Sequence, residues 1–182
     1  PQDENYNGNV NPNGIRSCYE EGKRIAESLC FDYQRLFNTN ICVARIFNTY
    51  GPKMKYNDGR VISNFINQAL NNQPLTIYGN GNQTRSFCYI DDLVECLIKL
   101  MNTTFSGPIN IGSDEEISIN QLGYLINKRI RNDHLILKKD IQEDDPQKRK
   151  PDLNLIKRLI NWEPKTSLEE GLEKTIKYFM KN

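Results

Sequence analysis

The segment Ser17–Arg24 contains a tyrosine and a lysine four residues apart, Tyr19 and Lys23. On a helix, this spacing places both side chains on one face, about one turn from each other. An ammonium group close to a phenol stabilises the phenolate and lowers the phenol pKa from its ordinary value of about 10. Tyr19 is therefore a candidate for proton exchange with a substrate hydroxyl near neutral pH. Because the same spacing occurs by chance in many helices, the surrounding residues must show whether this pair is catalytic.

The sequence predicts the helix that carries this pair over residues 15–37, directly after turn-forming residues at 11–14. Six residues fall close to one line along it: Tyr19, Lys23, Ala26, Cys30, Tyr33 and Phe37. We expect this stripe to be buried against a sheet or to face a ligand at its N-terminal end, and both can hold together.

A β-branched apolar run at 41–47 predicts a buried strand after that helix. The strand ends in a loop that begins with Asn48 and Thr49. Ligands of open α/β sheets bind beyond the carboxyl ends of the strands, so both side chains are placed to contact one. The alternative for Asn48 is that it only caps the turn.

The remaining elements alternate between helices and short strands. The predicted helices lie at 61–70, 118–130 and 151–160, with one that Asp91 and Asp92 cap and one that starts in the capping box Ser167–Glu170. The predicted strands lie at 74–78, 84–90, 108–112 and 135–137. Gly79 and Gly81 form a tight turn and not a dinucleotide fingerprint, because no third glycine or helix follows them. This order predicts a mixed α/β fold.

Composition excludes several classes of protein. The 182 residues are 37% hydrophobic and 26% charged with a net charge of +1, so we expect neither a nucleic-acid partner nor an acidic membrane surface. No apolar run approaches the roughly 20 residues of a membrane span. The single histidine, His134, opens an apolar run, which argues against a Ser/His or Cys/His hydrolase.

The cysteines indicate a reducing compartment. They are Cys18, Cys30, Cys42, Cys88 and Cys96. Their number is odd and no pair has Cys-x-x-Cys spacing, so we expect no disulfide framework and no metal site. Cys42 and Cys88 lie inside apolar runs, as buried free thiols do. A cytoplasmic location follows as the expectation.

With these motifs in place, the chain resembles, almost end to end, the C-terminal half of the extended short-chain dehydrogenase/reductase family. Within the family it is most similar to the branch that decarboxylates UDP-glucuronate. The resemblance is carried by residues 8–12, 17–24, 44–52, 57–65, 75–79, 83–87, 144–152, 162–164 and 168–172. The Tyr-x-x-x-Lys spacing belongs to the whole superfamily. The surrounding Ser-Cys-Tyr-x-Glu-Gly-Lys-Arg form and the segment 58–61 are typical of the decarboxylase branch.

The resemblance implies that residues 1–182 form the C-terminal part of a Rossmann-like α/β domain together with its smaller substrate-binding subdomain. The sequence lacks the family's glycine-rich turn, which binds the NAD pyrophosphate. It also lacks the Ser/Thr partner of the tyrosine and the acidic residue that assists decarboxylation. We therefore expect a fragment, or a half-protein that needs a complement, and we expect it to be inactive alone. Family members of full length generally form homodimers through the helix that carries the tyrosine.

The implied chemistry takes place at C4 of a nucleotide-linked sugar. Tyr19, as phenolate, takes the proton of the C4 hydroxyl while hydride passes to NAD. Lys23 lowers the pKa of Tyr19 and hydrogen-bonds the nicotinamide ribose. The 4-ketone is β to the C5 carboxylate, so CO2 leaves readily, and return of the hydride yields UDP-xylose.

Other roles follow from the resemblance residue by residue. Cofactor contacts are implied for Thr49, Arg60 and, through its backbone, Lys55. Diphosphate contacts are implied for Asn48, Arg85 and Arg149. Tyr78 would flank the uracil. Tyr33 lies 14 residues from Tyr19, about 21 Å along the helix, so it would meet a distant part of the substrate.

Purely structural roles remain as alternatives for these residues, and other functions remain as alternatives for the whole chain. Tyr33 and Tyr78 can be core aromatics, Arg85 can form a surface ion pair, and residues 148–150 can be a solvated charge run. A nucleotide-sugar 4,6-dehydratase or 4-epimerase would share Tyr19 and Lys23. A further alternative is not an enzyme: the chain can be a non-catalytic partner of a full-length enzyme. Against it, the sequence retains the five residues Tyr19, Lys23, Arg60, Arg85 and Arg149 together.

Overall fold

Helices and short strands alternate along the chain in the computed structural model, which describes residues 1–130, 136–140 and 148–181. The elements are α1 (Ser17–Phe37), β1 (Cys42–Ile46), β2 (Thr49–Tyr50), α2 (Val61–Leu70), β3 (Leu75–Tyr78), β4 (Thr84–Ser86), β5 (Cys88–Tyr89), α3 (Ile90–Met101), β6 (Gly107–Ile111), β7 (Glu116–Ser118), α4 (Ile119–Ile130), β8 (Ile136–Lys139), β9 (Lys148–Arg149), α5 (Asn154–Ile160) and α6 (Leu168–Phe179). The predicted α/β class is confirmed. His134 and the motif residues 144–147 lie outside the described residues.

The strands pair in small groups, mostly in parallel. β1 pairs with β6, β2 with β5 and β3 with β8, all in parallel. β4 lies between β7, which runs antiparallel to it, and β9, which runs parallel. The prediction of one strand over 84–90 is wrong, because the chain divides at Phe87 into β4 and β5, which have different partners. β2, β7 and β9 were not predicted, since two or three residues carry no readable alternation, and β2 lies where a loop was expected.

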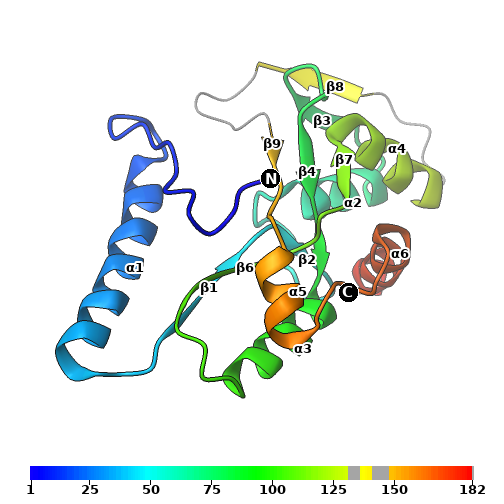
Figure 1. Cartoon of the computed structure of the whole chain (residues 1–182). Helices are drawn as coiled ribbons and strands as arrows, with labels where there is room; N and C mark the ends of the chain where they lie inside the picture. The colour runs from blue at the N-terminus through cyan, green and yellow to red at the C-terminus, as the bar shows by residue number, and fades with distance from the viewer. Residues whose placement is uncertain (131–135, 141–147, 182) are drawn as a thin grey trace.

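Two hydrophobic clusters hold these elements together. In the first, α2, β3, α4 and α6 pack around the side chains of Phe65, Leu75, Leu122 and Leu172. In the second, α3, β6 and α5 pack around those of Cys96, Ile111, Ile156 and Trp162. Figure 1 shows α2 and α4 beside β3 and β7, with α3 and α5 at the lower end of the molecule. The apolar spacing of the predicted helices is the spacing that these clusters bury.

N-caps were predicted for two helices, α3 and α6, and only the cap of α6 is confirmed. Ser167 caps α6 as predicted, since its side chain accepts a hydrogen bond from the backbone N–H of Glu170 at 3.2 Å. Capping of α3 by Asp91 and Asp92 is wrong, because α3 already begins at Ile90. Asp92 instead accepts a hydrogen bond from the backbone N–H of Thr166 at 2.9 Å. Its carboxylate therefore joins α3 to the segment before α6.

The cysteines are free thiols wherever the structure describes them, in different environments. Cys88 and Cys96 are buried, and desolvation raises the pKa of each thiol to about 12. The predicted burial of Cys42 is wrong, because it lies at the exposed end of β1. Among the described strands, β1 pairs only with β6, so its other edge has no strand partner there, and the residues at both of its ends are exposed.

Helix α1 stands apart from the other helices on one side of the molecule (Figure 1). None of its residues is buried within the described structure, so the predicted burial of its stripe against a sheet is wrong. Tyr33 and Phe37 contact each other at a ring distance of 5.3 Å while both remain exposed. Arg45 of β1 donates two hydrogen bonds, of 3.0 and 2.6 Å, to Glu27 of α1. The link between helix and strand is thus an ion pair and not an apolar layer.

Gly171 allows α6 to approach the Tyr50 side chain closely. A Cβ atom at this position would overlap Tyr50 Oη, and the Tyr50 hydroxyl donates to the carbonyl of Leu168 at 3.3 Å. Substitution Gly171→Ala should therefore lower the free energy of unfolding by about 1–3 kcal/mol. Gly22 of α1 has open space around its Cβ position, so Gly22→Ala should raise it by up to about 1 kcal/mol. Urea unfolding measures the free energy of unfolding of both variants. If both substitutions changed it in the same direction, the close contact between Gly171 and Tyr50 would be contradicted.

Candidate active site

The proposed catalytic pair lies at the start of α1. Tyr19 belongs to the first turn and Lys23 to the next, and Lys23 Nζ lies 5.6 Å from the centroid of the Tyr19 ring. The Tyr19 side chain is 65% exposed, so its hydroxyl can be reached from outside the described structure. Arg24 Nη1 donates to the carbonyl of Asn7 at 2.6 Å, which ties this part of the helix to the preceding loop. The predicted geometry of one helix face is therefore present.

Asn48 lies just beyond the carboxyl end of β1, as predicted, and directly before β2. Its backbone carbonyl accepts a hydrogen bond from the N–H of Cys88 at 2.9 Å, which holds the residue beside β5. Its side-chain nitrogen, Nδ2, is buried and has no hydrogen-bond partner among the described residues. A buried donor without a partner costs about 1–3 kcal/mol. This cost favours a ligand contact over the turn-capping alternative.

Thr49 and Arg60, both expected at the cofactor, lie on separate elements. The hydroxyl of Thr49, on β2, donates to the carbonyl of Phe47 at 3.0 Å. Arg60 is the N-cap of α2, and its Nε lies 3.6 Å from Asp58 Oδ2 with the side chain exposed. Lys55 is exposed in the loop between β2 and α2.

Arg85 and Arg149 are brought together by strand pairing. They are register partners in the parallel pair of β4 and β9, so their side chains project to the same face. Arg85 is only 9% exposed and its Nη1 donates to the carbonyl of Thr84 at 2.8 Å, which does not fit the surface ion-pair alternative. Arg149 is half-buried and Lys148 beside it is exposed, so the charged run at 148–150 is only partly solvated. Two planar guanidinium groups on one face could each donate paired hydrogen bonds to the phosphate oxygens of a diphosphate.

The two tyrosines expected at the substrate are both exposed, so neither is a core aromatic within the described residues. Tyr78 ends β3, is 38% exposed, and its carbonyl accepts a hydrogen bond from Gln83 Nε2 at 2.8 Å. Tyr33 lies four turns along α1 from Tyr19 and contacts Phe37. The structure thus joins Tyr19 with Lys23 and Arg85 with Arg149, and leaves Tyr33 at a separate position.

The polar residues around β9 were not predicted as part of a site. A cavity of about 630 Å³ lies between residues 1–6 and the strands β7 and β9, with Glu116, Lys148 and Lys150 in its wall. The Thr84 hydroxyl donates to Glu116 at 2.9 Å, and this bond, together with Lys150 and Lys148, lowers the pKa of Glu116. One signal was present in the sequence: Glu116, Lys148 and Lys150 lie in short segments rich in charged residues.

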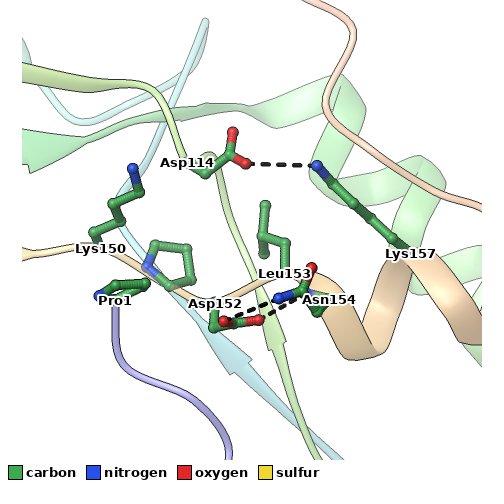
Figure 2. Close-up of a pocket in the computed structure, with 8 residues that line it drawn as sticks. Pro1, Asp114, Lys150, Asp152, Leu153, Asn154 and Lys157 are labelled. Atoms are coloured by element: carbon green, nitrogen blue, oxygen red, sulfur yellow. Dashed lines mark hydrogen bonds and ion pairs between the residues drawn. The ribbon is translucent and has the colours of Figure 1, made fainter.

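A smaller cavity of about 160 Å³ lies next to it, where the chain passes from β9 into α5. Figure 2 shows Lys157 extending to Asp114, with Nζ 3.5 Å from Oδ2, and Asp152 bonded to Asn154. Lys157 pairs with Asp114, Lys150 pairs with Glu116 outside this cavity, and Asp152 accepts hydrogen bonds from Asn154, so we assign no group of this cavity to the candidate site.

Among the described residues, no helix is long and apolar enough to cross a membrane. The same residues contain no group of three or more His, Cys, Asp or Glu side chains that could hold a metal ion.

The chain is similar to a known protein family and to several named proteins. The model of the NAD dependent epimerase/dehydratase family matches residues 1–112. UDP-glucuronic acid decarboxylase 1 of Xenopus tropicalis is 52% identical over 181 residues, which are 100% of this chain and 43% of that protein. UDP-glucuronic acid decarboxylase 6 of Arabidopsis thaliana is 52% identical over 172 residues, 94% of this chain and 50% of that protein. The chain thus spans half the length of these relatives or less.

Solved structures give the same fold. UDP-glucuronic acid 4-epimerase from Bacillus cereus, in complex with UDP-glucuronic acid and NAD, superposes with a TM-score of 0.84 at 30% identity, over 90% of this chain and 52% of that one. UDP-glucose 4-epimerase from Thermotoga maritima, with UDP-glucose, superposes with a TM-score of 0.87 at 29% identity, over 96% of this chain and 59% of that one. These neighbours confirm the Rossmann-like α/β class.

Proposed function

Because the chain belongs to the NAD dependent epimerase/dehydratase family, we propose that the protein containing it converts UDP-glucuronate to UDP-xylose through a 4-keto sugar. The observation that carries this proposal is the 52% identity, over the whole chain, to a relative named UDP-glucuronic acid decarboxylase. The exposed pair of Tyr19 and Lys23 supports it, since this chemistry starts by removing a proton from a sugar hydroxyl. The enzyme would be a lyase, because a C–C bond breaks without net oxidation.

The donor set at the start of α1 and at β2 fits a nicotinamide cofactor. When bound, NAD accepts hydride from C4 of the sugar and later returns it. The phenol of Tyr19 and the ammonium of Lys23 are suited to the hydroxyls of a ribose. Thr49 and Arg60 supply a hydroxyl and a guanidinium for the rest of the cofactor, with Lys55 contributing through its backbone. The neighbour from Bacillus cereus, of the same fold, holds NAD together with UDP-glucuronic acid.

Tyr19 carries the proton transfer in the proposed mechanism. Its phenolate takes the proton from the C4 hydroxyl, and the ammonium of Lys23 stabilises the phenolate. The resulting 4-ketone is β to the C5 carboxylate, so the electrons of the breaking C–C bond move into an enolate as CO2 leaves. A proton then adds to C5, and Tyr19 returns its proton to O4 when C4 is reduced.

Substrate binding is assigned to the polar groups at the ends of the strands. Arg85 and Arg149 are in register on one face and would hold the two phosphates by charge-assisted hydrogen bonds. The buried Nδ2 of Asn48 would donate to the same group. Tyr78, half-exposed at the end of β3, would flank the uracil. Tyr33 would meet only a distant part of the substrate.

We also propose which part of the whole protein this chain forms, how that protein assembles and where it is located. Residues 1–182 would be the C-terminal portion of the family's domain, with a glycine-rich half supplying most of the cofactor site. The exposed apolar residues of α1, among them Ile25, Leu29 and Leu36, would pack in a homodimer. The free cysteines are consistent with a reducing, cytoplasmic location.

The test incubates the protein encoded by the full reading frame with NAD and UDP-glucuronate. Release of CO2 and formation of UDP-xylose, followed by mass spectrometry, would support the proposal. An isomer formed without loss of mass would indicate a 4-epimerase, the activity named for the solved neighbours. Loss of water from a nucleotide-linked glucose would indicate a 4,6-dehydratase. No reaction with any of them would favour the non-catalytic partner.

A further inference from the structure

The segment at residues 1–5 lies along the chain that follows β9. The backbone N–H of Gln2 donates to the carbonyl of Lys150 at 2.8 Å, and the N–H of Asp152 donates to the carbonyl of Gln2 at 2.7 Å. The side chain of Gln2 completes the contact, because its Oε1 accepts the N–H of Lys150 at 3.0 Å. Figure 2 shows Pro1 beside Lys150 and Asp152 at this crossing. Gln2 therefore binds both backbone polar groups of Lys150.

The bond to Gln2 Oε1 acts on the residue before Lys150. The N–H of Lys150 belongs to the peptide unit that also contains the carbonyl of Arg149. β9 has only two residues, and its other edge pairs with β4. The backbone of Arg149 is therefore fixed by β4 on one side and by Gln2 on the other.

Gln2 itself is held by a hydrogen bond from β6. Its carbonyl accepts a hydrogen bond from Asn110 Nδ2 at 3.0 Å, and Asn110 is a buried polar residue of β6. Two residues further along, Glu4 Oε1 accepts the N–H of Asn110 at 3.0 Å, and the carbonyl of Glu4 accepts a bond from Arg45 at 2.8 Å. The segment is thus fixed to β6 and β1 independently of β9.

From this chain of contacts we propose that Gln2 is a positioning residue, which aims the Arg149 guanidinium at the diphosphate through the N–H of Lys150. The inference rests on the proposed function, because it needs Arg149 to bind the diphosphate of the substrate. A peptide unit that loses one of its two supports can rotate, and the long arginine side chain carries that rotation to its guanidinium.

The experiment uses the protein of full reading frame and measures the dissociation constant for UDP by calorimetry, with KM and kcat for UDP-glucuronate. Gln2→Ala removes the acceptor for the Lys150 N–H, so UDP should bind about fivefold to tenfold more weakly, the usual effect of one lost hydrogen bond. KM should rise by a similar factor with little change in kcat. Gln2→Glu keeps an acceptor oxygen at the same place and should restore the affinity.

Glu4→Ala is the matched control, because it removes a side-chain acceptor from the same segment without touching β9. It should lower the melting temperature about as much as Gln2→Ala but leave UDP affinity unchanged. Equal losses of affinity in both variants would overturn the inference, since the effect would then be one of general stability. Failure of Gln2→Glu to restore the UDP affinity would also overturn the inference.

Arg149→Ala separates this inference from the proposed function. If it weakens UDP binding and Gln2→Ala adds nothing in its background, both stand, because the two residues act through one contact. If it weakens binding while Gln2→Ala has no effect in the otherwise native protein, only the inference fails. If Arg149→Ala leaves UDP binding unchanged, the proposed diphosphate contact fails and the inference falls with it.

Discussion

Replacement of Tyr19 by phenylalanine in the protein of full reading frame should lower kcat for UDP-glucuronate by about a hundredfold to ten-thousandfold, the usual range for a general acid or base. The substitution removes only the hydroxyl and keeps the aromatic ring, so folding should be unaffected. KM should change little, because the hydroxyl acts on the reacting C4 group and not on the nucleotide. Steady-state CO2 release measures the effect.

Tyr124→Phe is the matched control for this substitution. Tyr124 lies on α4 and is also 65% exposed, but it is on a different element from the candidate site. This variant should keep the native kcat. If Tyr19→Phe also kept kcat within a few-fold of the native value, Tyr19 would not be the proton-transferring group, and the proposed mechanism would have to be abandoned.

Removal of the guanidinium of Arg85 is expected to act mainly on substrate binding. Hydrogen bonds to charged groups contribute about 1.5–3 kcal/mol each, so Arg85→Gln should raise KM for UDP-glucuronate by about tenfold to a hundredfold. Arg85 is also buried and donates to the carbonyl of Thr84, so the free energy of unfolding should fall by about 1 kcal/mol. Enzyme kinetics and urea unfolding measure the two effects separately.

Arg158→Gln provides the comparison of equal charge change. Arg158 is exposed on α5, where its Nε donates to the carbonyl of Asn154 within the same helix. It should leave KM unchanged. A rise in KM of the same size in both variants would mean that net charge, and not a contact by Arg85, governs the affinity.

The sequence by itself determined what is encoded within one element. The period of 3.6 residues placed Tyr19 and Lys23 on one helix face, and apolar spacing predicted α2 at its observed bounds, Val61–Leu70. The box at Ser167 marked the start of α6. The carboxyl end of the β1 run marked Asn48 as a residue beyond a strand. Each of these signals depends on neighbours a few residues away, so no tertiary information was needed.

Only the tertiary structure decided how distant segments meet. The division at Phe87 and the register of Arg85 with Arg149 come from strands of two or three residues, whose pairing is set by the surrounding packing and not by a local pattern. The stripe of α1 has helical spacing, but burial depends on what lies over it, and no described element does. Gln2 contacts Lys150 across 148 residues of sequence. A hydrogen bond to a backbone N–H leaves no residue signature on the segment that supplies that N–H, so this contact could be found only in the folded chain.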